Sequence, residues 1–245
     1  MIRNVRIYQL LIILCFVAVW EITTRLGIVD SFIFSSPSRV IKCFIEMAAD
    51  GSIFYHIGVT LLETFVSFSL VILIGILAAV ILWWNESAAK VLEPYLVVLN
   101  SLPKSALAPV FIVWLGNNMK TIIVAAVSVA VFGSIINLYT DFIHVEEDKI
   151  KLIRTLGGGK RDILLKVIIP SNIPSIISIM KVNIGLSLVG VIIGEFLAAK
   201  AGLGYLIIYG SQVFKLDWVI MSIVILCILA TGLYQLLAYF ERKYN

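Results

Sequence analysis

Charge is scarce in this chain. Of its 245 residues, 14% are charged and 61% are hydrophobic, and the mean hydropathy is +1.06. A soluble domain has about a quarter charged residues and about half apolar residues. The composition therefore excludes an ordinary soluble protein and indicates one that lies in a lipid bilayer. Nothing marks a separate soluble domain or a linker, so we expect a single transmembrane domain over residues 1–245.

Cysteine and histidine are scarce as well. The three cysteines, Cys15, Cys43 and Cys227, are scattered along the chain. They form neither a disulfide framework nor a metal-ligand spacing. His56 and His144 stand alone, and we interpret both as structural residues rather than metal ligands. The sequence therefore predicts no metal site.

Motifs for catalysis and nucleotide binding are missing. The glycines at 157–159 and the lysine after them resemble a P-loop only in part. The motif G-x-x-x-x-G-K-[ST] fails, because Arg154 stands at its first glycine position and Arg161 at its hydroxyl position. No nucleophile is paired with a base either. The sequence therefore predicts a protein that is not an enzyme and does not bind ATP itself.

Long apolar stretches are abundant. A membrane-spanning helix needs about 20 apolar residues, because each residue adds about 1.5 Å and the hydrocarbon core is about 30 Å thick. Three stretches meet this length without any charge, at residues 65–84, 121–139 and 218–240. Three more contain or follow charged residues, at 7–24, 94–116 and 173–196. We predict an all-α integral membrane protein with six spans, the first an uncleaved helix rather than a signal peptide.

Basic residues are distributed unevenly across these spans. With six spans both termini lie on one side, which holds 11 lysines and arginines, against six on the other. The larger group consists of Arg3, Arg6, Lys90, Arg242, Lys243 and the six basic residues within residues 146–170. The positive-inside rule therefore predicts that both termini and residues 146–170 are cytoplasmic. This asymmetry accounts for the net charge of +4, so no nucleic acid partner is implied.

The predicted outer loop between the first two spans contains a helix signal. Ser36 is a suitable N-cap, Pro37 suits the first helical position, and Gly51 suits the end of the helix. The apolar residues at helical spacing between them are Val40, Ile41, Phe44, Ile45 and Ala48. Two interpretations stay open: a helix that lies on the outer membrane surface, or one that packs against neighbouring spans.

The charged segment, residues 146–170, is a polar island between apolar stretches. Its six basic residues are Lys149, Lys151, Arg154, Lys160, Arg161 and Lys166. Apolar residues predict two short amphipathic helices, with Ile150, Ile153 and Leu156 on one face of the first and Ile163, Leu164, Val167 and Ile168 on one face of the second. We expect Gly157 to end the first helix in the left-handed conformation and Pro170 to end the second. Such a pair can enter a partner's groove or rest on lipid headgroups.

This segment resembles the cytoplasmic coupling loop of the permease subunits of binding-protein-dependent ABC importers. In that family Glu-Ala-Ala is followed by three residues, a glycine, nine residues and Ile-x-Leu-Pro. Gly157 and the V-I-I-P that ends at Pro170 have this spacing, and the R-T-L of residues 154–156 is also typical. K-L-I stands at residues 151–153 in place of Glu-Ala-Ala, so no role carries over from the family's glutamate.

Further motifs resemble the nitrate, sulfonate and taurine branch of that family, in the same order along the chain. S-P-S at 36–38 resembles its outer loop. L-P-K-S-A-L-A-P at 102–109 and W-L-G at 114–116 resemble its third span. E-F at 195–196 and A-G-L-G-Y-L at 201–206 resemble the end of its fifth span and the loop beyond. Together the matches cover most of the chain, which is identified as a member of this branch.

The resemblance implies a type I-like importer fold, with a cytoplasmic coupling loop at residues 140–170 of the permease domain. It also implies a second permease subunit, as a homodimer, two cytoplasmic ABC ATPases that dock on the two loops, and an extracytoplasmic solute-binding protein. ATP and Mg²⁺ would be bound by the ATPases, and this chain would hold no cofactor. The residues that the resemblance assigns to docking are Arg154, Thr155, Leu156, Gly157, Ile163, Leu164 and Pro170.

Charged residues inside the predicted spans are candidates for the translocation path or its gate. Lys104 lies near the middle of the third span, between Pro103 and Pro109. A lysine at that depth costs roughly 2.5–3.5 kcal/mol of insertion free energy, so it should face a cavity or a partner. It would favour an anionic substrate, or pair with Glu63 or Glu195. Glu195 itself lies near the outer end of the fifth span, as a gate residue or a paired carboxylate.

The branch and Lys104 together predict a small anion such as a sulfonate, taurine or nitrate as the substrate. Relatives of the branch also import heterocyclic vitamin precursors such as the thiamine pyrimidine, which is the alternative. A rival from another class is an ion-coupled secondary transporter, which would use Glu63 and Glu195 and would leave the charged segment unexplained. A third interpretation is a membrane scaffold whose charged segment recruits a cytoplasmic protein.

Overall fold

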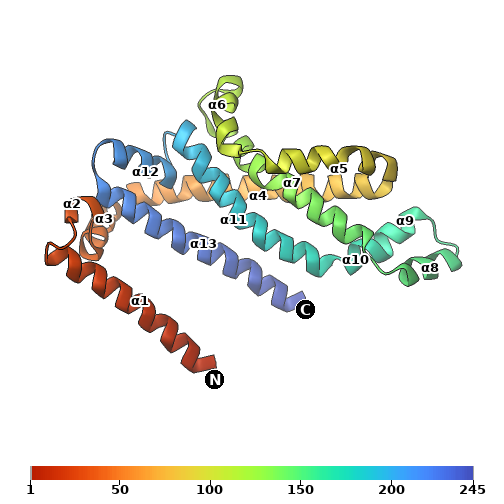
Figure 1. The fold of residues 1–245 in the computed structure, drawn as a ribbon, viewed down its shortest axis with the longest axis horizontal. Helices are drawn as coiled ribbons and strands as arrows, with labels where there is room; N and C mark the ends of the chain where they lie inside the picture. The colour runs from red at the N-terminus through yellow and green to blue at the C-terminus, as the bar shows by residue number, and fades with distance from the viewer. Residues whose placement is uncertain (1, 245) are drawn as a thin grey trace. The chain divides into compact units, whose positions relative to one another are not determined.

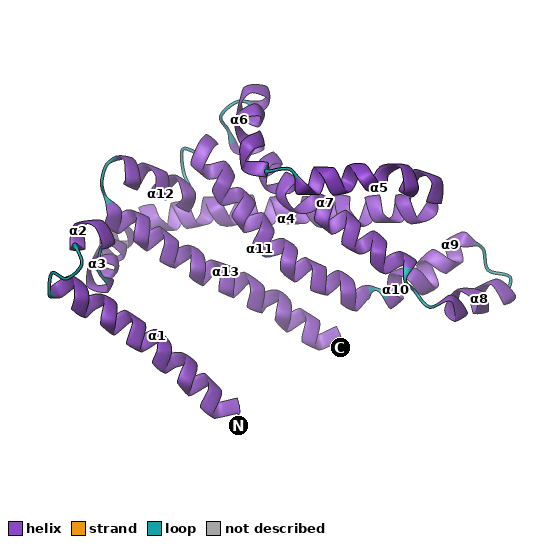
Figure 2. Cartoon of the chain, in the orientation of Figure 1, coloured by secondary structure: helices purple, strands orange, loops and turns teal. Residues whose placement is uncertain are grey.

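The computed structural model describes residues 2–244, and the side chains of residues 7–9 and 11–242. The described side chains do not include those of Arg3, Arg6 and Lys243, which belong to the larger group of basic residues. Every regular element in the described part is a helix, as predicted (Figures 1 and 2). The chain forms two compact units, Met1–Val59 with Lys200–Ile228, and Thr60–Ala199 with Leu229–Asn245.

Five helices are long and apolar enough to cross a membrane. They are α1 (Ile2–Arg25), α4 (Ser52–Trp84), α7 (Met119–Ile143), α11 (Ile173–Ala198) and α13 (Leu216–Tyr244). Each contains one of the predicted spans, so these five predictions are confirmed. Helix α4 has 33 residues, or about 50 Å, and therefore exceeds the hydrocarbon core of about 30 Å.

The predicted third span, residues 94–116, is not one helix. It is divided between α5 (Glu86–Ser101) and α6 (Lys104–Leu115), which are bent by 94° at the break between them. Leu102 at the break is extended, with φ −61° and ψ 138°. The ring of Pro103 causes this, because a proline disfavours helical geometry in the residue before it. The pair is a broken span or a re-entrant loop, and only as a broken span does it bring the total to six.

The predicted loop helix is α3 (Pro37–Ala49), in the unit that also contains α2 (Ser31–Phe34) and α12 (Leu203–Gln212). The Ser36 hydroxyl accepts the Arg39 N–H at 3.4 Å, and Gly51 has φ +78°, so both ends are as predicted. The buried face differs from the prediction. Its members are Val40, Cys43 and Met47, whereas Ile41 and Ile45 are 59% and 61% exposed.

An ion pair explains the orientation of α3. Arg39 Nη2 lies 2.8 Å from Asp217 Oδ2, and the Ser35 hydroxyl donates to Asp217 Oδ1 at 2.6 Å. Because Arg39 is tied to the start of α13, its neighbour Val40 turns inward and Ile41 turns outward. One face of α3 therefore packs against protein, as the second interpretation of this helix requires.

The other unit is held together by the packing of α7 against α11 (Figure 1). A Cβ added to Gly190 would lie 2.6 Å from Ala126 Cα, and one added to Gly194 would lie 2.9 Å from Ile122 Cα. Small residues let the two backbones approach this closely, as is common between membrane helices. The Asn183 side-chain amide donates to the Ser134 hydroxyl at 2.9 Å across the same contact.

Candidate functional site

The first helix of the charged segment is α8 (Glu147–Thr155). Acidic residues lie in its first turn, and exposed ion pairs join Lys149 to Glu146 at 3.1 Å and Lys151 to Glu147 at 3.2 Å. Ile150 and Ile153 are half-buried against a core cluster that includes Leu138 and Phe142 of α7. This part of the predicted face is confirmed. Leu156 is 75% exposed, so its place on that face was predicted wrongly.

The helix ends in a tight glycine motif. Gly157 has φ +80°, and its N–H donates to the Arg154 carbonyl at 3.0 Å. The Gly158 N–H donates to the Ile153 carbonyl at 2.9 Å. These two bonds form a Schellman motif, which satisfies carbonyls that the end of a helix leaves open. The prediction of a left-handed Gly157 is confirmed, and Leu156 stands out from the bend because the backbone reverses there.

The second helix runs from Lys160 to Ser171 with a change of pitch. It consists of α9 (Lys160–Ile163), the π-helix η1 (Leu164–Ile168) and α10 (Ile169–Ser171). Its predicted apolar residues, Ile163, Leu164, Val167 and Ile168, are all buried. Pro170 does not end the helix, which continues to Ser171. The Ile169 N–H donates five residues back to the Leu164 carbonyl, and this wider turn accommodates the proline ring.

The residues assigned to docking therefore fall into two groups. Arg154, Thr155, Leu156 and Gly157 are exposed at the bend, and Pro170 is exposed at the far end. Ile163 and Leu164 are only 5% and 7% exposed, so they support the segment from inside. Leu152 and Leu165 are also exposed, by 59% and 52%. Apolar periodicity did not point to them, because they lie off the predicted apolar faces.

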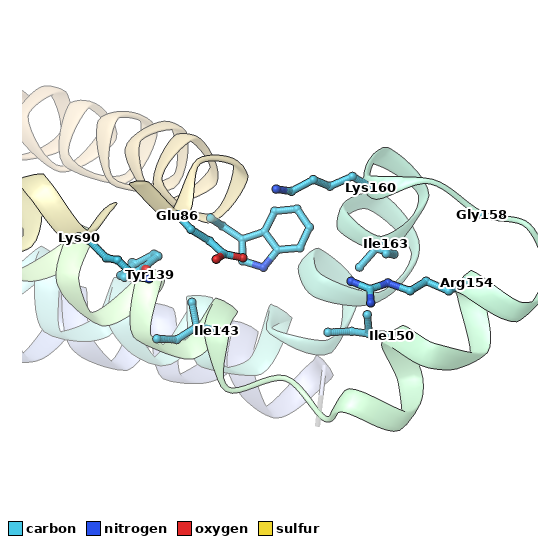
Figure 3. A pocket seen from close by; sticks show the side chains of 10 residues that line it. Glu86, Lys90, Tyr139, Ile143, Ile150, Arg154, Gly158, Lys160 and Ile163 are labelled. Carbon is cyan, nitrogen blue, oxygen red and sulfur yellow. The ribbon is translucent and has the colours of Figure 1, made fainter. Parts of the chain in front are cut away.

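A cavity of about 510 Å³ lies between the charged segment and the α4–α5 turn (Figure 3). Its polar lining comes from Glu86 and Lys90 of α5, Arg154 of α8 and Lys160 of α9. Its apolar lining includes Trp83, Tyr139, Ile143, Ile150 and Ile163. Lys160 Nζ also donates to the Trp84 carbonyl at 2.7 Å and lies 5.6 Å from the ring centre of Trp83.

The candidates for the translocation path lie at the α5–α6 break and on α11. Lys104 is the first residue of α6, and its ammonium group donates to the Leu99 carbonyl and lies 5.3 Å from the ring centre of Phe132. This single hydrogen bond leaves the lysine two N–H groups for another acceptor, and no carboxylate among the described residues pairs with it. Pro103 is the N-cap of α6, and Pro109 lies inside it, exposed.

Glu195 lies in a buried cluster with α4. The Thr60 hydroxyl donates to Glu195 Oε1 at 2.7 Å, and Glu63 is in hydrogen-bonding contact with Glu195. Both carboxyl groups are only 2% exposed. Glu195 is thus paired with protein groups, which fits the paired-carboxylate interpretation. The described contacts of Lys104 are with Leu99 and Phe132 and not with Glu63 or Glu195.

Comparison with known sequences identifies relatives of the chain. Residues 71–245 match the family described as the binding-protein-dependent transport system inner membrane component. The chain is 29% identical over 195 residues to the formylaminopyrimidine transport permease protein ThiX of Halalkalibacterium halodurans, covering 80% of this chain and 77% of that protein. It is 24% identical over 227 residues to the putative aliphatic sulfonates transport permease protein SsuC of Bacillus subtilis, covering 93% and 82%.

Solved structures agree on the fold. The inward-facing MetNI methionine ABC transporter matches with a TM-score of 0.68 at 20% identity, over 76% of this chain and 93% of that one. An amino acid ABC transporter solved with histidines matches with a TM-score of 0.62 at 18% identity, over 82% and 97%. The predicted importer permease fold is therefore confirmed. Since the family match covers most of the chain, this protein belongs to the inner membrane components of binding-protein-dependent transport systems, the permeases of ABC importers.

Proposed function

We propose that this permease forms the translocation path of an ATP-driven importer and receives force from a separate ATPase through the charged segment. The observation that carries the proposal is the exposed apolar edge at Leu152 and Leu156, next to the glycine bend. An apolar edge on a short helix suits insertion into a partner's groove. The buried side chains of Ile163 and Leu164 fix the segment to α4 and α7, so a push on the edge moves the spans.

The proposed assembly has two copies of this permease, two cytoplasmic ABC ATPases and an extracytoplasmic solute-binding protein. Both termini and the charged segment would face the cytoplasm. ATP and Mg²⁺ would be bound by the ATPases, while residues 1–245 would act as one permease domain without a cofactor. In this assembly Thr155, Leu156 and Gly157 would touch the ATPase directly, and Arg154 would do so only through its backbone, because its side chain lines the cavity. Ile163 and Leu164 would support them from inside.

Co-purification tests the docking proposal. Leu156→Asn removes the apolar side chain at the bend, and we expect it to lower both ATPase recovery and substrate-stimulated ATP hydrolysis. Leu26→Asn is the matched control, because Leu26 is 68% exposed in the turn after α1 and lies outside the charged segment. Equal ATPase recovery with the two variants would refute docking at this edge.

For the substrate we propose a small organic anion of the sulfonate class. Support comes from Lys104, whose ammonium group lies at a proline-broken span, and from the relative named as a sulfonate permease. Irregular backbone and a charged side chain at membrane depth are tolerated where they line protein or a water-filled path. A lysine at such a place favours an anionic substrate. A second candidate is a heterocyclic pyrimidine, favoured by the 29% identity to a permease named for formylaminopyrimidine.

Uptake assays separate these two substrates. In vesicles that contain the whole importer, Lys104→Gln should reduce uptake of a radiolabelled sulfonate and leave the neutral pyrimidine unaffected. Lys104→Arg retains the charge and should preserve sulfonate uptake. Transport of the pyrimidine alone by the wild-type importer would replace the first candidate with the second.

A further inference from the structure

The cavity beside the charged segment has an excess of positive charge. Lys90, Arg154 and Lys160 reach it from three helices, against the single carboxylate of Glu86. Figure 3 shows Arg154 and Lys160 extending from α8 and α9 toward Glu86. Three cations around one space repel each other, so an anion that enters the space lowers the electrostatic free energy.

The cations of the cavity differ from other lysines in the same segment. Lys149, Lys151 and Lys166 each lie within 2.8–3.2 Å of a carboxylate oxygen, on Glu146, Glu147 and Asp162. In the described part of the chain, the side chains of Lys90 and Arg154 make no hydrogen bond or ion pair. Lys160 uses one of its three N–H groups for the Trp84 carbonyl. The donors around the cavity therefore have capacity for a further acceptor.

The position of the cavity indicates which anion it meets. It begins at Trp83, at the end of the long apolar helix α4, and tryptophan is enriched where a membrane-spanning helix reaches the interface. Tyr139, Ile143 and Ile150 provide an apolar wall beside the cations. A cationic space with an apolar wall at this depth matches a lipid, whose phosphate is charged and whose chains are not.

We propose that this cavity binds the phosphate group of an anionic lipid headgroup, held by Lys90, Arg154 and Lys160. The volume of about 510 Å³ is that of a small-molecule site and admits a glycerol phosphate headgroup. The bound lipid would join the α4–α5 turn to the charged segment. The site does not depend on the docking of an ATPase, because its geometry is complete within this chain.

Native mass spectrometry of the purified full chain tests the proposal. The probe is phosphatidylglycerol, titrated against phosphatidylcholine. The variant Lys90→Gln/Arg154→Gln should bind phosphatidylglycerol more weakly, by roughly fivefold for each charge removed. Lys149→Gln/Lys151→Gln is the matched control, because it removes two charges from the same region but none from the cavity. Arg154→Lys retains the charge and should retain binding.

Three results would overturn the proposal. Equal loss of phosphatidylglycerol from the two double variants would mean that the surface charge acts without a site. Full displacement of the lipid by an equal concentration of inorganic phosphate would mean that free phosphate, and not a lipid, is the ligand. Thermal unfolding of Lys90→Gln/Arg154→Gln in phosphatidylcholine alone is the control for folding, and an unchanged midpoint would show that the variant is folded. If this folded variant still bound phosphatidylglycerol as the wild type does, the site would also be refuted.

Discussion

The ammonium group of Lys160 donates a hydrogen bond of 2.7 Å to the backbone carbonyl of Trp84, 76 residues earlier in the chain. Trp84 is the last residue of α4, where backbone carbonyls lack helical partners and the helix dipole is negative. Lys160 therefore caps this span from the charged segment. Movement of α9 can reach α4 through this bond as well as through the chain itself.

Loss of this cap should loosen the segment. We expect Lys160→Met to lower the free energy of unfolding by about 1 kcal/mol, since the bond is charge-assisted but exposed. The same variant should hydrolyse more ATP per substrate imported, because α4 would follow the segment less closely. Thermal unfolding and the ratio of hydrolysis to uptake are the measurements. Lys160→Arg is the conservative variant, and its failure to restore the ratio would argue against the link.

The glycines of the bend should differ in their tolerance of alanine. A Cβ on Gly158 would lie 2.5 Å from Ile153 Cγ2 and 3.0 Å from the Ile153 carbonyl oxygen, whereas a Cβ on Gly159 would meet nothing within 4 Å. Gly158→Ala should therefore destabilise the protein by about 1–3 kcal/mol, and Gly159→Ala should be nearly neutral. The difference in stability can be measured by thermal unfolding of the two variants, which differ in the position of the alanine by one residue. Equal unfolding midpoints would contradict the geometry of the bend.

The ion pair between α11 and α13 should be important for stability. Lys181 Nζ lies 2.6 Å from Glu241 Oε2, with side chains only 14% and 23% exposed. Glu241→Gln would leave the lysine charge nearly buried without its counter-ion, which costs about 3 kcal/mol. The exchange Lys181→Glu/Glu241→Lys should recover most of the loss in a thermal unfolding assay. If the double variant were no better than the single one, the pair would not be the cause.

The buried carboxyl groups of Glu63 and Glu195 should tolerate an amide. A glutamine at position 63 keeps the size of the side chain and can donate an amide N–H to the carboxyl group of Glu195, so it suits this position. We expect Glu63→Gln to change the free energy of unfolding by less than about 0.5 kcal/mol. Glu63→Leu removes a partner of Glu195 and should cost about 1–3 kcal/mol. An equal cost for both substitutions would exclude the hydrogen bond.

Cys43 should react slowly with thiol reagents. Burial raises the pKa of its thiol to about 11, and the nearby carboxylates of Asp217 and Glu46 act in the same direction. The thiolate is the reactive form, so the rate of maleimide labelling should rise about tenfold per pH unit up to that value. The assay needs the variant Cys15→Ser/Cys227→Ser, and the unfolded chain, with an ordinary thiol, is the control. A labelling rate that levels off near the ordinary thiol pKa of about 8.5 would contradict this environment.

The helices follow largely from local patterns. Long apolar stretches define five spans, three of them without any charge, because a lipid-exposed backbone must satisfy its own hydrogen bonds, whatever the neighbours are. The glycine bend at Gly157, the cap at Ser36 and the apolar face of residues 163–168 also depend on a few adjacent residues. The family motifs were equally local, which is why the importer permease could be identified from them.

Tertiary structure decided the rest, because it depends on residues that are distant in the sequence. Apolar periodicity predicted a face for α3, but the bond from Arg39 to Asp217, 178 residues away, turned that helix. The sequence predicted one span at residues 94–116, whereas the structure has a 94° break at Leu102 and Pro103, whose angle depends on the packing of α5 and α6 against α7. Likewise, Lys90, Arg154 and Lys160 meet around one cavity only because three helices converge there. The spacing of residues along the chain does not indicate which distant residues lie together in the folded protein.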